Sequence, residues 1–308
     1  MEASVTLKKV GKLAGDRTIL AGMSFGVERG SLVAIIGDND SGKSTLLRVL
    51  AGFEKPDYGN IYVHGLDMVK RRAETCRIIA YVPHESDFDP WLTIEQNIRF
   101  IGLLHKIPTH KLDHRISGYS ERLGISEFLE ENTGGMSLGI QKRALIVRAL
   151  VQEPQVLVID EPTAFMDADG SRMVWELLME MHGERTIIYA SQNLREVELA
   201  NDRILVLHHG HMALDGTLEK LLATTNNYHQ FHIEFEKLND DLYQKLANVS
   251  TVVNPSRVGN TFHFYGRSRR AFFHVLKKAT DAVQLDFTVD TLGLNDLMDS
   301  KYARKGME

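Results

Sequence analysis

A glycine-rich segment with a lysine near its end is the part of the chain best suited to chemistry. Residues 37–45 have the sequence GDNDSGKST and fit the pattern G-x-x-x-x-G-K-[ST]. In such a turn the glycines let backbone N–H groups face phosphate oxygens, the lysine adds a positive charge, and the next hydroxyl is available to Mg²⁺. The pattern predicts a loop that binds the phosphates of a nucleotide through Gly37, Asp38, Asn39, Asp40, Ser41, Gly42, Lys43, Ser44 and Thr45.

Two adjacent carboxylates far downstream complete a site of this kind. Asp160 and Glu161 follow Val156–Ile159, an apolar and mostly β-branched run that predicts a strand buried on both faces. Ligands of an open α/β sheet collect at the carboxyl ends of its strands. We therefore expect Asp160 to serve Mg²⁺ and Glu161 to orient an attacking water. The alternative is a polar turn that closes the strand, and the lysine motif makes it less favoured.

The segments around these motifs predict how they are positioned. Leu32–Ile36 is an apolar run that predicts a buried parallel strand leading into the loop, and a helix is expected to begin near Thr45. Val5–Glu28 has antiparallel character, residues 88–150 are predicted to be helical, and Arg185–Ala190 predicts a further buried strand. This order is typical of an α/β fold with a P-loop NTPase core and a helical subdomain.

Together with a serine-glycine element between them, the two motifs resemble those of the ATP-binding subunits of ABC transporters, over residues 4–220. Met136–Ile140 (MSLGI) is similar to the family signature LSGGQ, which caps ATP held by the opposite subunit. The resemblance implies ATP and Mg²⁺ as cofactors and a head-to-tail dimer with a second, identical or different, ATP-binding subunit. It assigns Ser137 and Gly139 to the partner's nucleotide, although a plain helix N-cap would also explain the serine.

Further family positions are occupied by unexpected residues. His84 lies where the family carries a glutamine, and Gln192 lies where it carries a histidine, so the two residues look exchanged. The resemblance implies that both approach the γ-phosphate, that His84 also approaches Mg²⁺, and that Asp167 links the two sites of the dimer. A compensating exchange across one site and independent drift in a slow enzyme are equally open interpretations.

Milder departures predict modest ATP affinity and slow hydrolysis. Asp40 replaces a glycine of the phosphate loop, and Leu138 and Ile140 replace the first glycine and the glutamine of the signature. Ala14 falls where an aromatic residue usually stacks on adenine, so about 1 to 3 kcal/mol of stacking is absent. Glu161 argues against a dead site. Two alternative functions stay open: a soluble ABC-type switch, and a degenerate regulatory subunit that binds ATP without turnover.

The composition of the chain limits the kinds of partner and the cellular location that we expect for the protein. The 308 residues include 36 Lys and Arg against 41 Asp and Glu, a formal net charge of -5, so no nucleic-acid partner is expected. We find neither a leader-like start nor 18 consecutive apolar residues. We expect a cytoplasmic protein, peripheral on the inner face of the cell membrane through separate membrane subunits. A single cysteine, Cys76, excludes an internal disulfide and is expected to be a buried small hydrophobe.

The pattern changes after the polar stretch at residues 223–227, which predicts an ATP-binding domain over residues 1–222 and an accessory domain over 223–308. The second part predicts a β-α-β-β-α-β, ferredoxin-like α+β domain. Its predicted elements include strands at Val249–Val253 and Val283–Val289 and a helix at Arg269–Thr280. It resembles the accessory domain of bacterial export-type ABC ATPases, and regulation or subunit dimerisation is its predicted role.

Overall fold

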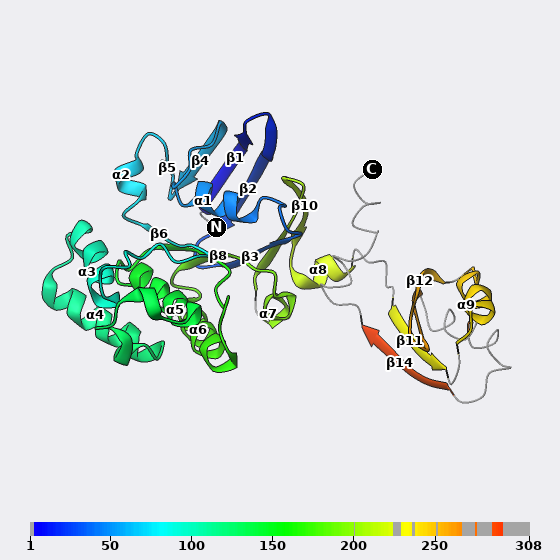
Figure 1. Ribbon diagram of the computed structural model, residues 1–308. Coiled ribbons are helices and arrows are strands. Elements are labelled where there is room, and N and C mark those ends of the chain that lie inside the picture. Colours follow the sequence, from blue (N-terminus) through cyan, green and yellow to red (C-terminus); the bar gives the residue numbers. More distant parts are fainter. Residues whose placement is uncertain are drawn as a thin grey trace. The chain divides into compact units, whose positions relative to one another are not determined.

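The structure is a computed structural model that describes residues 3–199, 201–223, 229–235, 238–250, 252–266, 275 and 285–291 (Figure 1). The chain forms two compact units, residues 1–215 and 216–308. In the described residues the first unit contains two sheets and the second contains one, and each unit has a buried core of its own. The functional boundary predicted at residues 222 and 223 stays a prediction, because compactness alone does not assign function.

A sheet with a parallel centre carries the first unit. Its order is β10-β9-β3-β8-β7-β6, and the neighbours from β9 to β6 run parallel. Every residue of β7 and β8 is buried, as the continuous apolar sequence predicts for strands covered on both faces. The predicted α/β class is confirmed. The strands are β3 (Leu32–Gly37), β6 (Ile79–Val82), β7 (Val156–Asp160), β8 (Thr186–Ala190), β9 (Arg203–His208) and β10 (His211–Gly216).

A second, antiparallel sheet forms from the start of the chain, as predicted. Its order is β2-β1-β4-β5, and helix α1 (Lys43–Leu50) packs between it and the parallel sheet (Figure 1). Leu46, Leu47, Val49 and Leu50 of α1 are buried in one core with side chains of both sheets. The helix that begins at the phosphate loop is thus held from two sides. The strands are β1 (Ala3–Ala14), β2 (Arg17–Glu28), β4 (Tyr58–Val63) and β5 (Leu66–Asp67).

The predicted helical subdomain lies between β6 and β7. It contains α3 (Ile94–Leu104), α4 (Thr109–Arg122) and α5 (Leu138–Leu150), with 3-10 turns at Ser126–Phe128 and Thr133–Gly135. Thr93 and Gln96 form a capping box that starts α3. Outside the subdomain, the described part of the first unit contains α2 (Arg72–Thr75), α6 (Ala168–Met181) and α7 (Leu194–Leu199), and α8 (Leu218–Ala223) lies in the second unit.

Cys76 corrects one prediction. Its side chain is exposed, not buried. The residue caps the C-terminus of α2, a four-residue helix whose buried residue is Thr75. A helix of one turn presents a single residue to the core, so its small apolar neighbour remains at the surface.

The second unit is built on an antiparallel sheet with the order β12-β13-β11-β14, which is the order that a ferredoxin-like fold requires. Phe231 and Phe264 stack in its core. The predicted helix at residues 269–280 lies outside the described residues, except for position 275. The elements are β11 (His229–Phe235), α9 (Asp240–Ala247), β12 (Val253–Val258), β13 (Thr261–Gly266) and β14 (Leu285–Thr291).

The strand predicted at residues 249–253 is wrong. Strand β12 begins at Val253 and runs through Pro255. Proline is tolerated there because β12 is at the edge of the sheet, and the pairing register shifts between Val253 and Ser256.

Candidate active site

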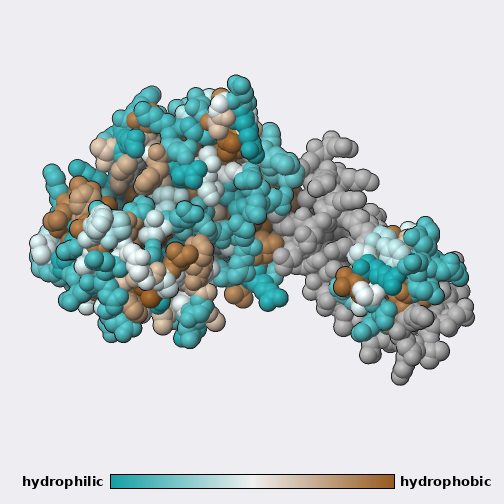
Figure 2. Space-filling model, in the orientation of Figure 1, coloured by the Kyte–Doolittle hydropathy of each residue, from teal (hydrophilic) through white to brown (hydrophobic). Residues whose placement is uncertain are grey.

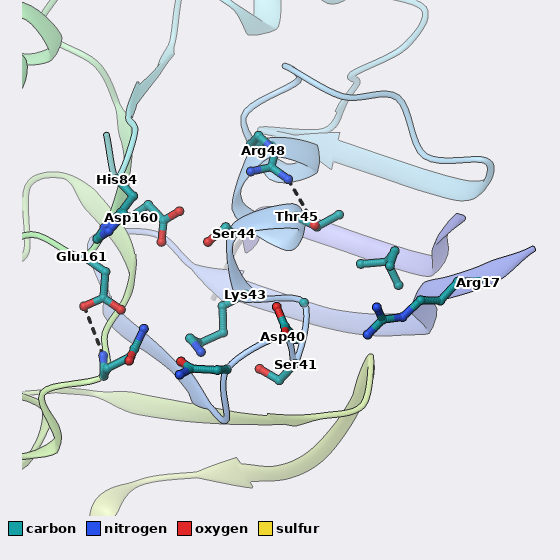
Figure 3. Close-up of a pocket in the computed structure, with 14 residues that line it drawn as sticks. Arg17, Asp40, Ser41, Lys43, Ser44, Thr45, Arg48, His84, Asp160 and Glu161 are labelled. Atoms are coloured by element: carbon teal, nitrogen blue, oxygen red, sulfur yellow. Dashed lines mark hydrogen bonds between the residues drawn. The ribbon is translucent and has the colours of Figure 1, made fainter. Parts of the chain in front are cut away.

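Both predicted motifs meet in one cavity of about 590 Å³, beside the carboxyl ends of β3, β7 and β8 (Figure 3). The parallel register brings these ends together, because β8 pairs with both β3 and β7. The sequence could predict this meeting because ligands of parallel sheets collect at that edge. The cavity is lined by Arg17, Ile19, Asn39, Asp40, Ser41, Gly42, Lys43, Ser44, Thr45, Arg48, His84, Asp160, Glu161 and Gln192.

The shape of the phosphate loop requires glycine at two positions. A Cβ at Gly37 would lie 2.3 Å from the carbonyl oxygen of Leu207, and one at Gly42, where φ is +101°, would lie 2.9 Å from that of Ile19. Asp40 adopts a left-handed backbone with φ 60°, a conformation that aspartate tolerates better than most residues. The Oγ atom of Ser41 is buried and has no hydrogen-bond partner within the described structure. These features fit a phosphate that would supply the missing partner.

Lys43 is held in place by the loop itself. Its Nζ donates to the carbonyl oxygens of Gly37 at 2.8 Å and Asp38 at 2.9 Å. Burial lowers the pKa of Lys43, while the nearby carboxylates of Glu161 and Asp160 act in the opposite direction. The positive charge is therefore positioned before any ligand arrives, which favours binding of an anion.

The two carboxylates differ in their surroundings. Asp160 ends β7 and is 3% exposed. Glu161 has a left-handed φ of 53°; its N–H donates to Ala190 O at 2.9 Å, and its Oε2 accepts from the N–H of Gln192 at 3.2 Å (Figure 3). Burial raises the pKa of Glu161, and the charge of Asp160 raises it further. A carboxylate in this setting is suited to accept a hydrogen bond from water.

His84 and Gln192, the exchanged pair, line the same cavity from different strands. His84 follows β6 and Gln192 follows β8. The Nδ1 atom of His84 is buried without a hydrogen-bond partner among the described residues, and its ring centroid lies 5.3 Å from that of Phe165. The imidazole thus has an unused polar atom beside the cavity. Whether the two residues compensate for each other stays a prediction.

Three of the cavity residues were predicted to hold Mg²⁺. Ser44, Asp160 and His84 line the cavity together. Hydroxyl and carboxylate oxygens are the donors that Mg²⁺ prefers, whereas imidazole nitrogen is typical of transition metals. The residues present therefore fit a magnesium ion held by Ser44 and Asp160, and the chemistry of His84 fits a hydrogen-bonding role better.

The predicted signature residues Ser137 and Gly139, and Asp167, do not line this cavity within the described structure. Ser137 caps α5, with Oγ accepting from Ile140 N at 3.3 Å, and Asp167 caps α6, with Oδ1 accepting from Gly170 N at 2.8 Å. Gly139 lies against the backbone of Phe165, where a Cβ would come within 2.7 Å of the carbonyl oxygen. The N-cap interpretation of Ser137 is thus confirmed, and its role toward a second subunit's nucleotide stays a prediction.

Three lining residues were missed by the sequence analysis. Arg17, Ile19 and Arg48 contribute to the cavity from β2 and α1. Arg17 and Ile19 follow the turn after Ala14. Because Ala14 is the position expected to contact adenine, it was the sequence signal that could have pointed to these two residues. Arg48 lies one helical turn after Ser44, and its Nη2 donates to the hydroxyl of Thr45 at 3.2 Å.

Comparison with known proteins agrees with this geometry. The family model described as ABC transporter matches residues 20–164. The ABC transporter ATP-binding protein NatA of Bacillus subtilis is 31% identical to this chain over 75% of this chain and 92% of its own length. The chain belongs to the ATP-binding proteins of ABC transporters. A second member of this ABC family, the Nod factor export ATP-binding protein I of Ralstonia nicotianae, is 28% identical and covers 88% of this chain and 84% of its own.

Solved structures share the fold of this ABC protein. One titled as the ATP-binding subunit of an ABC transporter superposes with a TM-score of 0.68 at 24% identity, covering 72% of this chain and 92% of its own. At that identity the likeness supports the cassette fold alone. Among the described residues, no helix combines the length and the apolar character needed to cross a membrane.

Proposed function

We propose that this ABC ATP-binding protein binds and hydrolyses ATP to drive transport through separate membrane subunits. The observation that carries the proposal is the single cavity that joins Lys43 and Ser44 to Asp160 and Glu161. A lysine, a hydroxyl and two carboxylates around one space can neutralise a triphosphate, hold its metal and position a water.

Binding of ATP would begin at the loop between β3 and α1. Backbone N–H groups at the start of α1 and the ammonium of Lys43 would receive the phosphate oxygens. Mg²⁺, held by Ser44 and Asp160, would supply charge neutralisation to the phosphates when bound. The Lys43 side chain needs little rearrangement, since two loop carbonyls already restrain it.

Hydrolysis would depend on Glu161. As a carboxylate it would accept a hydrogen bond from a water and direct the water oxygen toward the γ-phosphorus. The water oxygen would bond to the γ-phosphorus as the bond to the bridging oxygen breaks, and a proton of the water would pass to a phosphate oxygen, giving ADP and inorganic phosphate. The N–H of Gln192 restrains Glu161 through Oε2, so the orienting group is held at a defined place.

A second ATP-binding subunit would complete each site. The segment from Ser137 to Gly139 lies outside this chain's own cavity, which agrees with a role toward a nucleotide presented by a partner. We propose a head-to-tail dimer in which the start of α5 covers the partner's ATP. Leu138 is 52% exposed at this helix start, so it would stand between the backbone and the phosphate. Together with the added carboxylate of Asp40 in the cavity lining, this supports slow turnover.

Membrane subunits would dock on the helical subdomain. Large apolar side chains are exposed along and beside α3, and Figure 2 shows hydrophobic residues at the end of the unit that carries this helix. Trp91 is 88% exposed and Leu103 is 64% exposed. Such a surface is suited to a protein partner. We propose that docking places this chain on the cytoplasmic, inner face of the cell membrane. Export is the proposed direction, because relatives are named as export proteins.

Purification from native membranes tests the proposal. The tagged full-length chain, extracted with a mild detergent, should retain a polytopic membrane protein, and the complex should hydrolyse ATP faster than the isolated chain. Recovery from the soluble fraction alone, with full activity there, would favour the soluble switch instead. ATP binding without turnover in the complex would favour the regulatory subunit.

A further inference from the structure

Lys142 is a buried cation with no part in the steps of ATP binding and hydrolysis proposed above. It lies on α5, one helical turn after Leu138, and is 1% exposed. Its Nζ donates first to Asp160 O at 2.5 Å and second to Pro83 O at 2.6 Å. Both acceptors are backbone carbonyls; burial lowers the pKa of Lys142 to about 8, and the nearby charges of Asp160 and Glu161 act in the opposite direction. A buried ammonium is costly unless hydrogen bonds or opposite charges compensate for its lost hydration, so these two bonds stabilise it in this position.

The first acceptor belongs to the peptide that joins the two carboxylates. The carbonyl of Asp160 accepts from Lys142, and the N–H on the other side of this peptide, that of Glu161, donates to Ala190 O at 2.9 Å. Both polar groups of one peptide unit are therefore restrained. Glu161 has φ 53°, a conformation that a non-glycine residue keeps only where its surroundings impose it. The bond from Lys142 is one of the contacts that impose it.

The second acceptor belongs to the peptide that precedes His84. Lys142 Nζ restrains the carbonyl of Pro83, and His84 is the next residue and lines the cavity. One side chain therefore restrains the backbone at both His84 and Glu161. Lys142 is part of α5, so its two bonds link this helix to the backbone at both residues.

We propose that Lys142 is a positioning residue that couples the signature helix α5 to the Glu161 and His84 of its own subunit. The coupling rests on the proposed function, since the start of α5 would contact the ATP of the partner subunit. Engagement of that ATP by Ser137 would move α5, and Lys142 would pass the movement to the catalytic backbone. The two sites of a dimer would thus hydrolyse ATP cooperatively.

Replacement of Lys142 by methionine tests the coupling. Lys142→Met keeps an unbranched side chain that is one atom shorter and removes both hydrogen bonds. Arg115→Met is the matched control, because Arg115 Nη1 donates to Val151 O at 2.8 Å and so also links a cation to a carbonyl, at the opposite end of α5. Each variant is made in the full-length chain and assayed alone and with the co-purified membrane subunits.

We expect Lys142→Met to lower kcat at least tenfold, to change the KM for ATP less than threefold, and to reduce the Hill coefficient for ATP to 1. Lys142→Arg should recover part of the kcat, and Arg115→Met should retain kcat and the Hill coefficient within twofold. A kcat within twofold of the unsubstituted chain, or a loss shared equally by Arg115→Met, would overturn the proposal.

Hydrogen exchange gives a readout that does not need hydrolysis. In Lys142→Met the backbone amides of residues 83–86 and 160–164 should exchange faster than in the unsubstituted chain, while those of α4 should not. Lys142→Gln, which keeps one donor group, serves if the methionine variant does not fold. Unchanged exchange in both segments would overturn the coupling even if the variant hydrolyses ATP. The proposed function would be overturned by a different result, namely that Lys43 does not contribute to ATP binding.

Discussion

Asp40 places a negative charge inside the phosphate loop, and its replacement by asparagine should tighten ATP binding. Asp40 lines the same cavity as Lys43 and adopts φ 60°. Asparagine tolerates the left-handed backbone as well as aspartate does, so the loop should keep its shape. The substitution therefore changes the charge while leaving the backbone as it is.

The size of the effect follows from Coulomb's law. For an exposed carboxylate about 8 Å from a magnesium nucleotide with about two net negative charges, an effective dielectric constant of about 80 gives a repulsion of about 1 kcal/mol. Removing it should lower the Kd for ATP about fivefold. Because salt screens exposed charges, the gain should shrink to less than twofold at about 1 M ionic strength.

Equilibrium binding of a fluorescent ATP analogue, measured by titration with Mg²⁺ at two salt concentrations, provides the assay. Asp16→Asn is the control, because it makes the same change in net charge at a residue that does not line the cavity. A Kd that is unchanged or higher in Asp40→Asn, or a gain that Asp16→Asn matches, would refute the electrostatic reasoning.

Three further results are expected. The double exchange His84→Gln with Gln192→His should turn over ATP faster than either single variant, and effects that simply multiply would show that the residues do not compensate. Leu138→Gly should raise kcat severalfold in ATPase assays. It should also lower the free energy of unfolding by about 1 kcal/mol in denaturant titration, since glycine weakens a helix. An unchanged kcat would show that Leu138 does not obstruct the signature. Burial raises the pKa of Glu161 above the usual range of glutamate, and the carboxylate is the active form. The kcat should therefore fall as the pH is lowered through this raised pKa. A pH profile of kcat that stays flat there would contradict this role.

The local motifs could be predicted because sequence and physics agree there. Leu32–Gly37 leads into the loop and α1, and β7 ends in Asp160, as the apolar runs predict. Parallel pairing then brings the loop and the carboxylates to one edge of the sheet. The strand order of the second unit likewise follows from the predicted sequence of elements.

Tertiary contacts explain what the sequence could not predict. Lys142 has the residue type of a solvated helix face, and only the packing of α5 against β6 and β7 buries it. Pro255 signals a turn by its type, but an edge strand accommodates it. Cys76 is exposed because α2 is a single turn. In each case the decisive fact is the neighbour in space.

The union of Lys43 and Glu161 in one ATP site is tested most directly by measuring bound and hydrolysed ATP side by side in two variants. Lys43→Ala should lose retention of labelled ATP in the presence of Mg²⁺. Glu161→Gln should retain ATP at the level of the unsubstituted chain while its hydrolysis falls at least a hundredfold. Equal hydrolysis by Glu161→Gln and the unsubstituted chain, or undiminished retention of ATP by Lys43→Ala, would contradict the assignment of this cavity as the site of ATP hydrolysis.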